Sequence, residues 1–254
     1  MKHIHLITTL LVALLFLIAW EILPPALGVP RYIIPTASQC MDEFFRMVRL
    51  DDLVGHTFST FLMTLIGFSV GSLLGAVIGY LLGMSVFWER VLSPYILALQ
   101  IAPKVAFAPL FIMWFGFTFW PKLLVTILIV FFPILVNVLQ AMKTVDRDII
   151  NLARAYSLSR FEIFRKIEFP STLPALLAGL RIGATLAVIG VTVGELVGGN
   201  KGLGFLISYG EGQANAAMVF NSILLLTLIG IALYSTVTWA EAKLLHYIPK
   251  GEDQ

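Results

Sequence analysis

The sequence predicts an all-α membrane protein with six transmembrane helices, and three observations lead to that expectation. Hydrophobic residues make up 59% of the 254 residues and charged residues only 13%, about half the charged share of an ordinary soluble domain. The apolar residues occur in runs of about twenty, the length a helix needs to cross about 30 Å of hydrocarbon. Most charged residues lie between these runs. Lipid is therefore the expected solvent of this fold.

Six hydrophobic runs define the expected spans of a single transmembrane domain that covers residues 1–254. The runs lie at about 4–23, 57–84, 91–117, 123–142, 172–197 and 218–245. Between the first two, a proline-rich segment precedes an amphipathic stretch at 41–48, which is expected to lie along the membrane surface. The first run has features of a secretory signal peptide, but the five later runs favour a retained helix.

The distribution of lysine and arginine predicts the orientation, because these residues are enriched in cytoplasmic loops. Placing the amino terminus in the cytoplasm assigns ten of them to inner segments and five to outer segments. The inner ones are Lys2, Arg90, Lys143, Arg147, Arg154, Arg160, Arg165, Lys166, Lys243 and Lys250, and the outer ones are Arg31, Arg46, Arg49, Lys122 and Lys201. Both termini and the loop at 143–171 are therefore expected in the cytoplasm.

Glycine recurs at every fourth position of the second span and forms one slowly drifting stripe along the helix. The stripe consists of Gly67, Gly71, Gly75, Gly79 and Gly83. Small residues at this spacing let another helix approach closely. The contact is either static packing within one subunit or a moving or dimerising contact. The fifth span carries a weaker version at Gly179, Gly183, Gly190 and Gly194.

The inner loop at 143–171 is expected to form two short helices. Asp146 and Asp148 are suited to start the first, and Ser159 with Glu162 forms a capping box for the second, which Pro170 is expected to end. The apolar residues are Ile149, Ile150, Ala153 and Tyr156 on the first helix and Phe161, Phe164 and Ile167 on the second. They stand among basic residues. This surface fits either docking into another protein or an interfacial helix pair held by anionic lipid.

Lys104, Arg181 and Glu195 fall inside expected spans, where a charge facing lipid costs about 2.5–3.5 kcal/mol. Each is expected to face water or a partner, so the three are candidates for a translocation path. Arg181 and Glu195 lie about 21 Å apart along one helix and cannot pair within it; Glu195 is expected near the outer mouth. Arg181 is alternatively a structural residue that caps carbonyls freed by Pro103 and Pro109. Lys104 alternatively snorkels, or pairs with Glu195 or a loop acid.

Several kinds of chemistry find no support in the sequence. It lacks a Gly-x-x-x-x-Gly-Lys-Ser/Thr phosphate loop, so the chain is not expected to hydrolyse ATP. The histidines at 3, 5, 56 and 246 lie near span ends and do not suggest a metal site. Cys40 is the single cysteine and is expected to be a buried thiol. A net charge of +2 without a basic stripe gives no support to nucleic-acid binding.

The run NLARAYSLSRFEIFRKIEFPSTLP at 151–174 resembles the cytoplasmic loop of permeases of binding-protein-dependent ATP-binding-cassette importers. That family's pattern begins Glu-Ala-Ala, has Gly four residues after the second Ala and ends near Leu-Pro. Asn151, Leu152 and Ser157 replace the usual Glu, first Ala and Gly. Ser157 is expected either to adopt the positive backbone torsion that Gly supplies, at a cost, or to change the turn. The matching positions are Ala153, Arg154, Ser159, Arg160, Phe161, Phe164, Pro170 and Pro174.

Other stretches extend the resemblance from about residue 31 to the carboxyl terminus. APLFIMWFGF, LVGGNKGLGFLI and AGLRIGATLAVIGVTVGEL are similar to the branch that imports nitrate, aliphatic sulfonates and taurine, and PKVAFAPLF is similar to importers of thiamine-precursor pyrimidines. The resemblance implies the type I importer permease fold in the bacterial inner membrane and a small solute of one of these kinds.

The resemblance also implies partners. They are a second copy of the permease, an extracytoplasmic solute-binding protein and two cytoplasmic ATPase subunits that bind ATP and Mg²⁺ and grip the loop, so this chain holds no cofactor of its own. The coupling positions would be Ala153, Arg154, Ser157, Ser159, Arg160, Phe161, Phe164 and Pro170. Coupling would then be a rigid-body switch between inward and outward openings. The alternatives are a stand-alone ion-coupled carrier or a polytopic membrane enzyme, although the spans show no nucleophile motif or histidine cluster.

Overall fold

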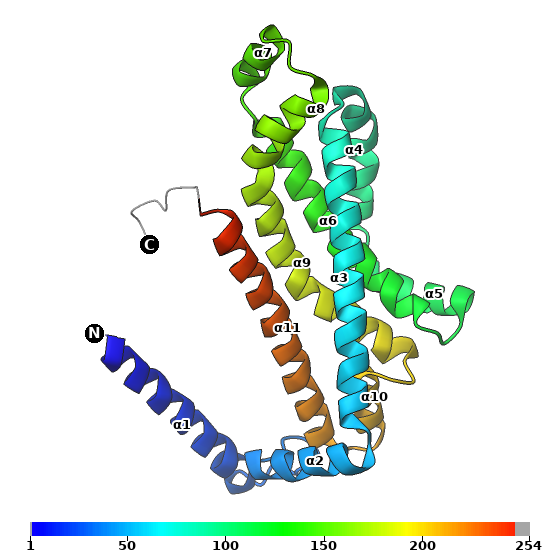
Figure 1. Cartoon of the computed structure of the whole chain (residues 1–254). Helices are drawn as coiled ribbons and strands as arrows, with labels where there is room; N and C mark the ends of the chain where they lie inside the picture. Colours follow the sequence, from blue (N-terminus) through cyan, green and yellow to red (C-terminus); the bar gives the residue numbers. More distant parts are fainter. Residues whose placement is uncertain (1, 247–254) are drawn as a thin grey trace.

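The computed structural model of this chain describes residues 2–246, with side chains from Ile7 onward, and every regular element in that part is a helix. The elements are α1 (Lys2–Ala26), α2 (Ala37–Leu50), α3 (Leu53–Gly83), α4 (Val86–Ile101), η1 (Lys104–Ala106), α5 (Phe107–Phe115), α6 (Trp120–Thr144), α7 (Arg147–Ala155), α8 (Arg160–Ile163), η2 (Phe164–Glu168), α9 (Phe169–Gly198), α10 (Leu203–Gly212) and α11 (Ala216–Leu244). They form an elongated bundle with α7 at one end and α2 lying across the other (Figure 1). These are called the α7–α8 end and the α2 end below. Lys250, which was counted as an inner residue, lies outside the described residues.

Five helical stretches are long and apolar enough to cross a membrane: Ile7–Ala26, α3, α6, the continuous stretch Arg160–Gly198 and α11. A sixth span consists of α4 together with η1 and α5, which are bent by 74° at a short break. The prediction of an all-helical fold with six apolar spans is thus confirmed, with the third span broken. The assignment of the whole chain to one domain stays a prediction.

The third span, expected at 91–117, is interrupted in its middle. α4 ends at Ile101, and Ala102 has extended backbone angles, with φ −53° and ψ 137°. Pro103 follows, and proline disfavours the helical conformation of the residue before it. Pro109 does not add a second break, because it lies in the first turn of α5, where a backbone N–H has no partner within the helix. α5 therefore leaves the bundle in a new direction (Figure 1).

α6 lies between α3 and α9, and both neighbours approach it through glycine. A Cβ atom on Gly75 of α3 would lie 2.6 Å from the carbonyl oxygen of Phe131, and one on Gly194 of α9 would lie 2.6 Å from the Cα of Lys122. Between lipid-exposed helices, such packing replaces the hydrophobic effect as the main source of association. The predicted close approach is confirmed, and the partner of both stripes is a helix of the same chain.

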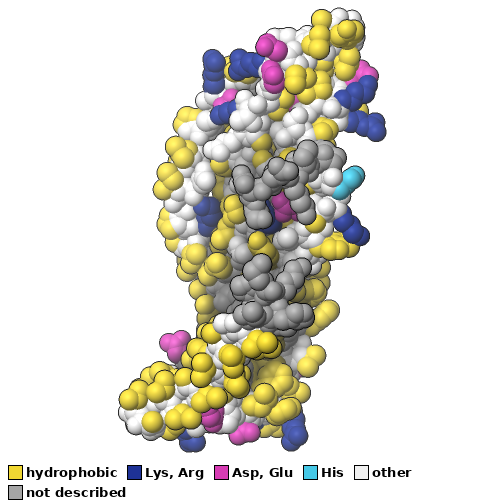
Figure 2. Space-filling model, turned by 90° about the vertical axis from the view of Figure 1, so that its left-hand side faces the viewer, with side chains coloured by type: hydrophobic (Ala, Val, Ile, Leu, Met, Phe, Trp, Pro, Cys, Tyr) yellow, Lys and Arg dark blue, Asp and Glu magenta, His cyan; other side chains and the backbone are white. Residues whose placement is uncertain are grey.

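α2 confirms the predicted amphipathic stretch and extends it to Ala37–Leu50. Thr36 and Gln39 form a capping box at its start, and Trp20 of α1 donates to the carbonyl oxygen of Pro35 at 2.8 Å. Cys40 is a buried free thiol, as expected. α1 runs into the α2 end, and α11 begins there and runs toward the α7–α8 end (Figure 1). Hydrophobic side chains cover much of the surface between the charged groups of the two ends (Figure 2).

Candidate functional site

The loop at the α7–α8 end begins with a helix that ends in a left-handed turn. Asp146 caps the start of α7, accepting from the Asp148 amide at 2.8 Å. At the other end of α7, Ser157 has a φ of 60°. The Ser157 N–H donates to the carbonyl oxygen of Arg154 at 2.8 Å, and the Leu158 N–H donates to the carbonyl oxygen of Ala153 at 3.1 Å. This pair of bonds is the Schellman motif, in which the left-handed position is usually glycine. The positive torsion expected at Ser157 is therefore confirmed.

The same loop exposes apolar side chains at the tip of the molecule. They are Ile149 at 49%, Leu152 at 58%, Tyr156 at 75% and Phe161 at 68% of their full exposure, and they are called the tip patch below. Ala153, by contrast, is buried. The sequence reading did not single out Leu152 as an exposed side chain; a large apolar residue replacing an alanine of the motif was the signal. Arg147, Arg154, Arg165 and Lys166 are exposed around the patch.

Two of the predicted coupling residues are instead engaged inside the chain. Arg160 contacts Glu168 through Nη1 at 2.7 Å and donates from Nη2 to the carbonyl oxygen of Met84, at the end of α3. Phe164 packs edge-on against Tyr80 of α3, with ring centroids 5.3 Å apart. Both side chains hold α8 to the bundle. A role for either in binding a partner stays a prediction.

Pro170 does not end the second loop helix as expected. Ser159 and Glu162 form the predicted capping box of α8, but the helix then continues through the π-helical turn η2 into α9. In that turn the Phe169 N–H donates to Phe164 rather than to the residue four positions back. The wider turn shifts the hydrogen-bond register just before Pro170, where a proline has no N–H to donate. α8 and the fifth span are therefore one continuous helical stretch.

Lys104 lies at the break of the third span. Its ammonium group donates to the carbonyl oxygen of Gln100 and lies 5.1 Å from the ring centroid of Phe132. The Gln100 carbonyl group, which the break leaves without a helical partner, and the face of the Phe132 ring therefore stabilise the charge of Lys104. Among the described residues no acid lies within 4.0 Å of Lys104, so the suggested pairing with Glu195 or a loop acid is not present.

Arg181 has an acidic partner that the sequence did not suggest. Its Nε lies 3.1 Å from a carboxylate oxygen of Glu241 on α11, with side-chain exposures of 38% and 19%. The alternative in which Arg181 caps carbonyls near Pro103 is not what the structure shows. One turn farther along α9, a groove of about 380 Å³ opens between α9 and α11. Thr185, Thr227 and Tyr234 supply hydroxyl groups to its otherwise apolar lining.

Glu195 is fully buried and belongs to a hydrogen-bond network at the α2 end. Thr60 of α3 donates to the carboxylate, with Oγ1 3.0 and 2.9 Å from the two oxygens. The backbone N–H of Gly204, at the start of α10, donates to Oε2 at 2.9 Å. A carboxylate at this place also fits the positive end of the α10 dipole. Its predicted position near one mouth of the bundle, before the glycine-rich loop, agrees with the structure, but its side chain does not line an open path.

The network holds four consecutive residues, two at the end of the glycine-rich loop and two at the start of α10. Lys122 of α6 donates to the carbonyl oxygen of Lys201 at 2.7 Å. The Gly202 N–H donates to Nδ1 of His56 at 2.9 Å, and the Leu203 N–H donates to Thr60 Oγ1 at 2.8 Å. With the bond from Gly204 to Glu195, side chains from α3, α6 and α9 each bind the loop. His56, Thr60, Lys122 and Glu195 are called the loop clamp below.

The three candidate path residues therefore do not share one site. Lys104 contacts α4 and α6, Arg181 contacts α11, and Glu195 belongs to the loop clamp. Sequence reasoning missed Thr60, Lys122 and Glu241, because each becomes significant only through a residue far away in the chain. A weak signal existed for Lys122, a cation at the start of a hydrophobic run.

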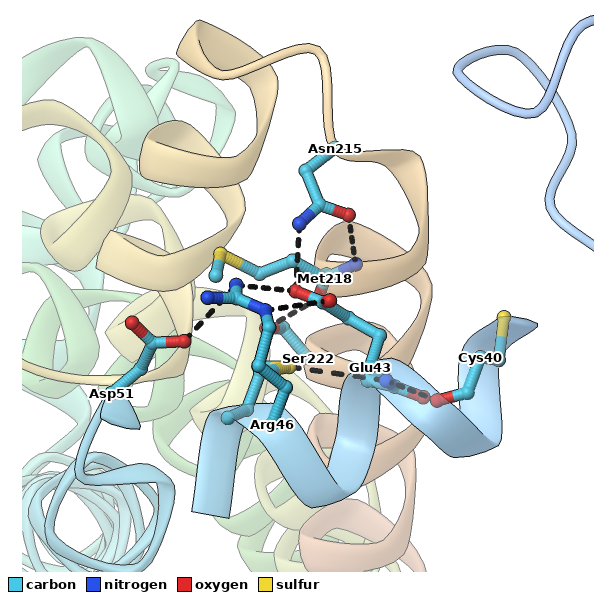
Figure 3. A network of polar contacts seen from close by, with 9 residues as sticks. Cys40, Glu43, Arg46, Asp51, Asn215, Met218 and Ser222 are labelled. Carbon is cyan, nitrogen blue, oxygen red and sulfur yellow. Dashed lines mark hydrogen bonds and ion pairs between the residues drawn. The ribbon is translucent and has the colours of Figure 1, made fainter. Parts of the chain in front are cut away.

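α2 is anchored to α11 by a second polar network (Figure 3). Glu43 accepts from Arg46 at 2.6 and 2.8 Å and from Asn215 at 2.6 Å, and Arg46 also pairs with Asp51 at 3.1 Å. Burial of Glu43 acts to raise its pKa, but the hydrogen bonds from Arg46 and Asn215 and the charge of Arg46 prevail, and the pKa is lowered. The anchor borders a polar hollow of about 460 Å³.

Within residues 2–246, no group of three or more His, Cys, Asp or Glu side chains could hold a metal ion. The described histidines His56 and His246 instead contact backbone atoms of Gly202 and Lys243. The arrangement of the site is thus one of packed helices and two polar networks, with an exposed apolar tip.

The comparisons with known proteins agree with this arrangement. Residues 69–246 match the family model described as the binding-protein-dependent transport system inner membrane component. The chain is 37% identical to the formylaminopyrimidine transport permease protein ThiX of Halalkalibacterium halodurans over 242 residues, covering 93% of this chain and 94% of that protein. It is 34% identical to the riboflavin transport system permease protein RibX of Chloroflexus aurantiacus, covering 87% and 82%. It is 30% identical to the putative aliphatic sulfonates transport permease protein SsuC of Bacillus subtilis, covering 94% and 86%.

A solved structure extends the likeness to the fold. A chain of the MetNI methionine ABC transporter in an inward-facing conformation aligns with a TM-score of 0.59 at 19% identity, covering 73% of this chain and 94% of that one. The type I importer permease fold is thereby confirmed, and a stand-alone carrier or a membrane enzyme is not favoured. This multi-pass chain belongs to the family of binding-protein-dependent inner membrane components, the permease subunits of ATP-binding-cassette importers.

Proposed function

We propose that two copies of this chain form the translocation pathway of an importer and that one ATPase subunit docks on the tip patch of each copy. The observation that carries this proposal is the exposure of Ile149, Leu152, Tyr156 and Phe161. α7, which carries Ile149, Leu152 and Tyr156, projects beyond the ends of the long helices (Figure 1). Phe161 lies on the following helix, α8. An exposed apolar patch with a polar rim is typical of a protein interface.

The charge of the same end supports its placement in the cytoplasm. Arg147, Arg154, Arg165 and Lys166 surround the tip patch, and the positive-inside rule assigns such a loop to the inner face. α1 begins and α11 ends on the α7–α8 side of α2 (Figure 1), so both termini belong to the cytoplasm as well. The α2 end then faces outward, where an extracytoplasmic binding protein delivers the solute.

The continuity of the fifth span supports mechanical coupling. The stretch Arg160–Gly198 is 39 residues long, or about 58 Å at the helical rise per residue. Arg160 and Phe164 fix its first turns to α3. A displacement of α8 by an ATPase that closes on ATP and Mg²⁺ would therefore move the span as a rigid body, and two such movements would alternate the inward and outward openings.

The pairing of Arg181 favours an uncharged organic solute over an anion. Arg181 is the cation within the fifth span, and Glu241 neutralises it. The neighbouring groove between α9 and α11 offers hydroxyl groups in an apolar setting. A small heteroaromatic compound, such as a thiamine-precursor pyrimidine, is the first candidate, and a sulfonate, taurine or nitrate is the second.

The docking proposal is tested by purifying the permease with the partners that accompany it from its native cell and identifying them by mass spectrometry. Phe161→Asp places a charge in the tip patch and should lower the amount of bound ATPase at least tenfold, while the permease stays inserted and folded. Phe161→Leu keeps an apolar side chain and serves as the matched control. Undiminished ATPase binding by Phe161→Asp would remove the patch from the interface.

The solute is tested by ATP-driven uptake into proteoliposomes that contain the assembled complex. We would supply three solutes in separate experiments: a formylaminopyrimidine, riboflavin and an alkanesulfonate. Each is supplied with a solute-binding protein that is specific for it. The proposal expects uptake of the pyrimidine and dependence on ATP. Uptake of any of the three by the permease alone would contradict the importer mechanism.

A further inference from the structure

The loop between α9 and α10 is bound to the bundle more completely than a connection of this length requires. Four consecutive residues, the last two of the loop (201 and 202) and the first two of α10 (203 and 204), each form a hydrogen bond with a side chain of the loop clamp. Exposed loops ordinarily direct such backbone groups to water. Here Thr60 and Glu195 have no exposed surface, and Lys122 is only 5% exposed. These hydrogen bonds therefore tie the end of the loop to α3, α6 and α9.

The backbone of the loop is fitted to the Glu195 carboxylate. Gly202 has φ 122° and ψ 171°, a region that only glycine adopts readily. A Cβ atom at Gly202 would lie 2.0 Å from Glu195 Oε1, and one at Gly204 would lie 2.7 Å from Glu195 Cβ. The contact is thus a close one between the side chain of a buried acid and two glycines.

Glu195 stands at the far end of the helical stretch that begins in the coupling loop. At the near end, Arg160 joins Glu168 to the end of α3, and Thr172 bonds to Tyr80 of α3 at 3.1 Å. At the far end, Thr60 of α3 joins Glu195 to the loop. The same pair of helices is therefore pinned together at both ends, and the glycine packing of α6 lies between.

We infer that Thr60 and Glu195 are positioning residues for transport, which make the α9–α10 loop and α10 move together with α9. Displacement of the fifth span at the α7–α8 end is thereby delivered to the outward-facing surface. This inference rests on the proposed function, because it names the residues that pass the ATPase-driven movement of α9 on to the outward-facing surface. Thr60 has the central place, since its hydroxyl donates to Glu195 and accepts from Leu203.

The first measurement is amide hydrogen exchange of a peptide that covers residues 199–206 in the full-length permease. Thr60→Val keeps the side-chain shape but removes the hydroxyl, and it should speed exchange of the Leu203 and Gly204 amides at least tenfold. Thr64→Val is the matched control, because Thr64 is equally buried and bonds only to the Thr60 carbonyl oxygen of its own helix. Unchanged exchange in Thr60→Val would overturn the inference, and this result needs no ATPase.

The second measurement follows movement at both ends of α9 in the assembled complex. In a Cys40→Ala background, spin labels at Asn200→Cys report the loop and labels at Ser171→Cys report the inner end of α9. Distances between the two copies are compared without nucleotide and with ATP and vanadate. In Thr60→Val the distance between the two labels at position 171 should change with nucleotide as in the unmodified complex. The change in the distance between the labels at position 200 should be lost, or its distribution broadened, with ATP hydrolysis retained.

The outcomes separate the inference from the proposed function. Normal shifts at both positions in Thr60→Val, despite faster amide exchange, would overturn the positioning role. Glu195→Gln provides a second variant, since it keeps an acceptor for Gly204 and should preserve more of the shift than Glu195→Ala. Failure of any ATPase to accompany the permease would instead refute the proposed function, and the exchange result would still decide whether the clamp holds the loop.

Discussion

The loops at the two ends of the fifth span differ in the groups that they expose and the groups that they pair. At the α7–α8 end, Arg160 pairs with Glu168, whereas Leu152, Tyr156 and Phe161 are more than half exposed. At the α2 end, the loop clamp buries polar groups and pairs them with the backbone of residues 201–204. Under the proposed function a partner covers the first surface, whereas the second has its polar groups paired within the chain. One helix thus connects the proposed docking surface to the loop clamp.

The largest expected effect on unfolding free energy comes from disrupting the loop clamp at the α2 end. Gly202→Ala places a Cβ atom against the Glu195 carboxylate in a backbone region reserved for glycine. We expect a loss of about 3 kcal/mol or more in unfolding free energy, from backbone strain and from buried hydrogen bonds left unmade. Equilibrium unfolding in mixed micelles measures it. Gly212→Ala is the control, because nothing lies within 4 Å of its added Cβ atom; equal stability of the two variants would contradict the fitted contact.

Within the coupling loop, substitutions of residues that bond to the bundle should lower the unfolding free energy more than substitutions of exposed residues. Arg160→Ala leaves the buried carboxylate of Glu168 without its partner. We expect a loss of about 2 kcal/mol in unfolding free energy, less than for a fully buried pair because the Arg160 side chain is 44% exposed. Arg165→Ala, on the exposed side of the same turn, should change it by less than about 0.5 kcal/mol. The same unfolding assay applies, and a reversed order would show that Arg160 serves binding rather than folding.

The α2 anchor provides a pH-dependent comparison. The folded pKa of Glu43 is lowered, mainly by Arg46 and Asn215 against the effect of burial. Its stabilisation is therefore present above the ordinary carboxyl pKa of 4.5 and is lost as the pH falls through the folded pKa. Glu43→Gln should lower the unfolding free energy by about 1 kcal/mol at pH 7, and the difference from the unmodified protein should shrink below pH 4.5. A difference that is constant with pH would contradict this assignment.

The smallest expected effect has the opposite sign. Ser157 adopts a φ of 60°, a conformation that costs a non-glycine residue about 1 kcal/mol. Ser157→Gly should therefore raise the stability of the loop by up to about 1 kcal/mol, measured as slower amide exchange at Leu158. Ser157→Ala keeps the cost and should leave exchange unchanged. If glycine instead speeds exchange, the serine hydroxyl stabilises the turn in a way that its backbone geometry does not reveal.

Local sequence signals predicted the features that depend on neighbouring residues. The capping box of Ser159 and Glu162 follows from a spacing of three residues. The left-handed turn at Ser157 was one of the two outcomes implied by the resemblance, in which glycine occupies this position. The hydrophobic runs gave the spans, because span length is set by the thickness of the bilayer. Pro170 was misjudged, since the π-helical turn that accommodates it is a property of the whole segment and not of one residue.

The sequence alone therefore determined that this chain is a six-span membrane protein with a structured basic loop, because helix length, capping and charge distribution are local properties. The tertiary structure decided the partners of the charges inside the spans. Glu195 meets Thr60 at a separation of 135 residues, and Arg181 meets Glu241 on another helix. A buried charge must be paired, but only the packing of α3, α9 and α11 determines with which residue.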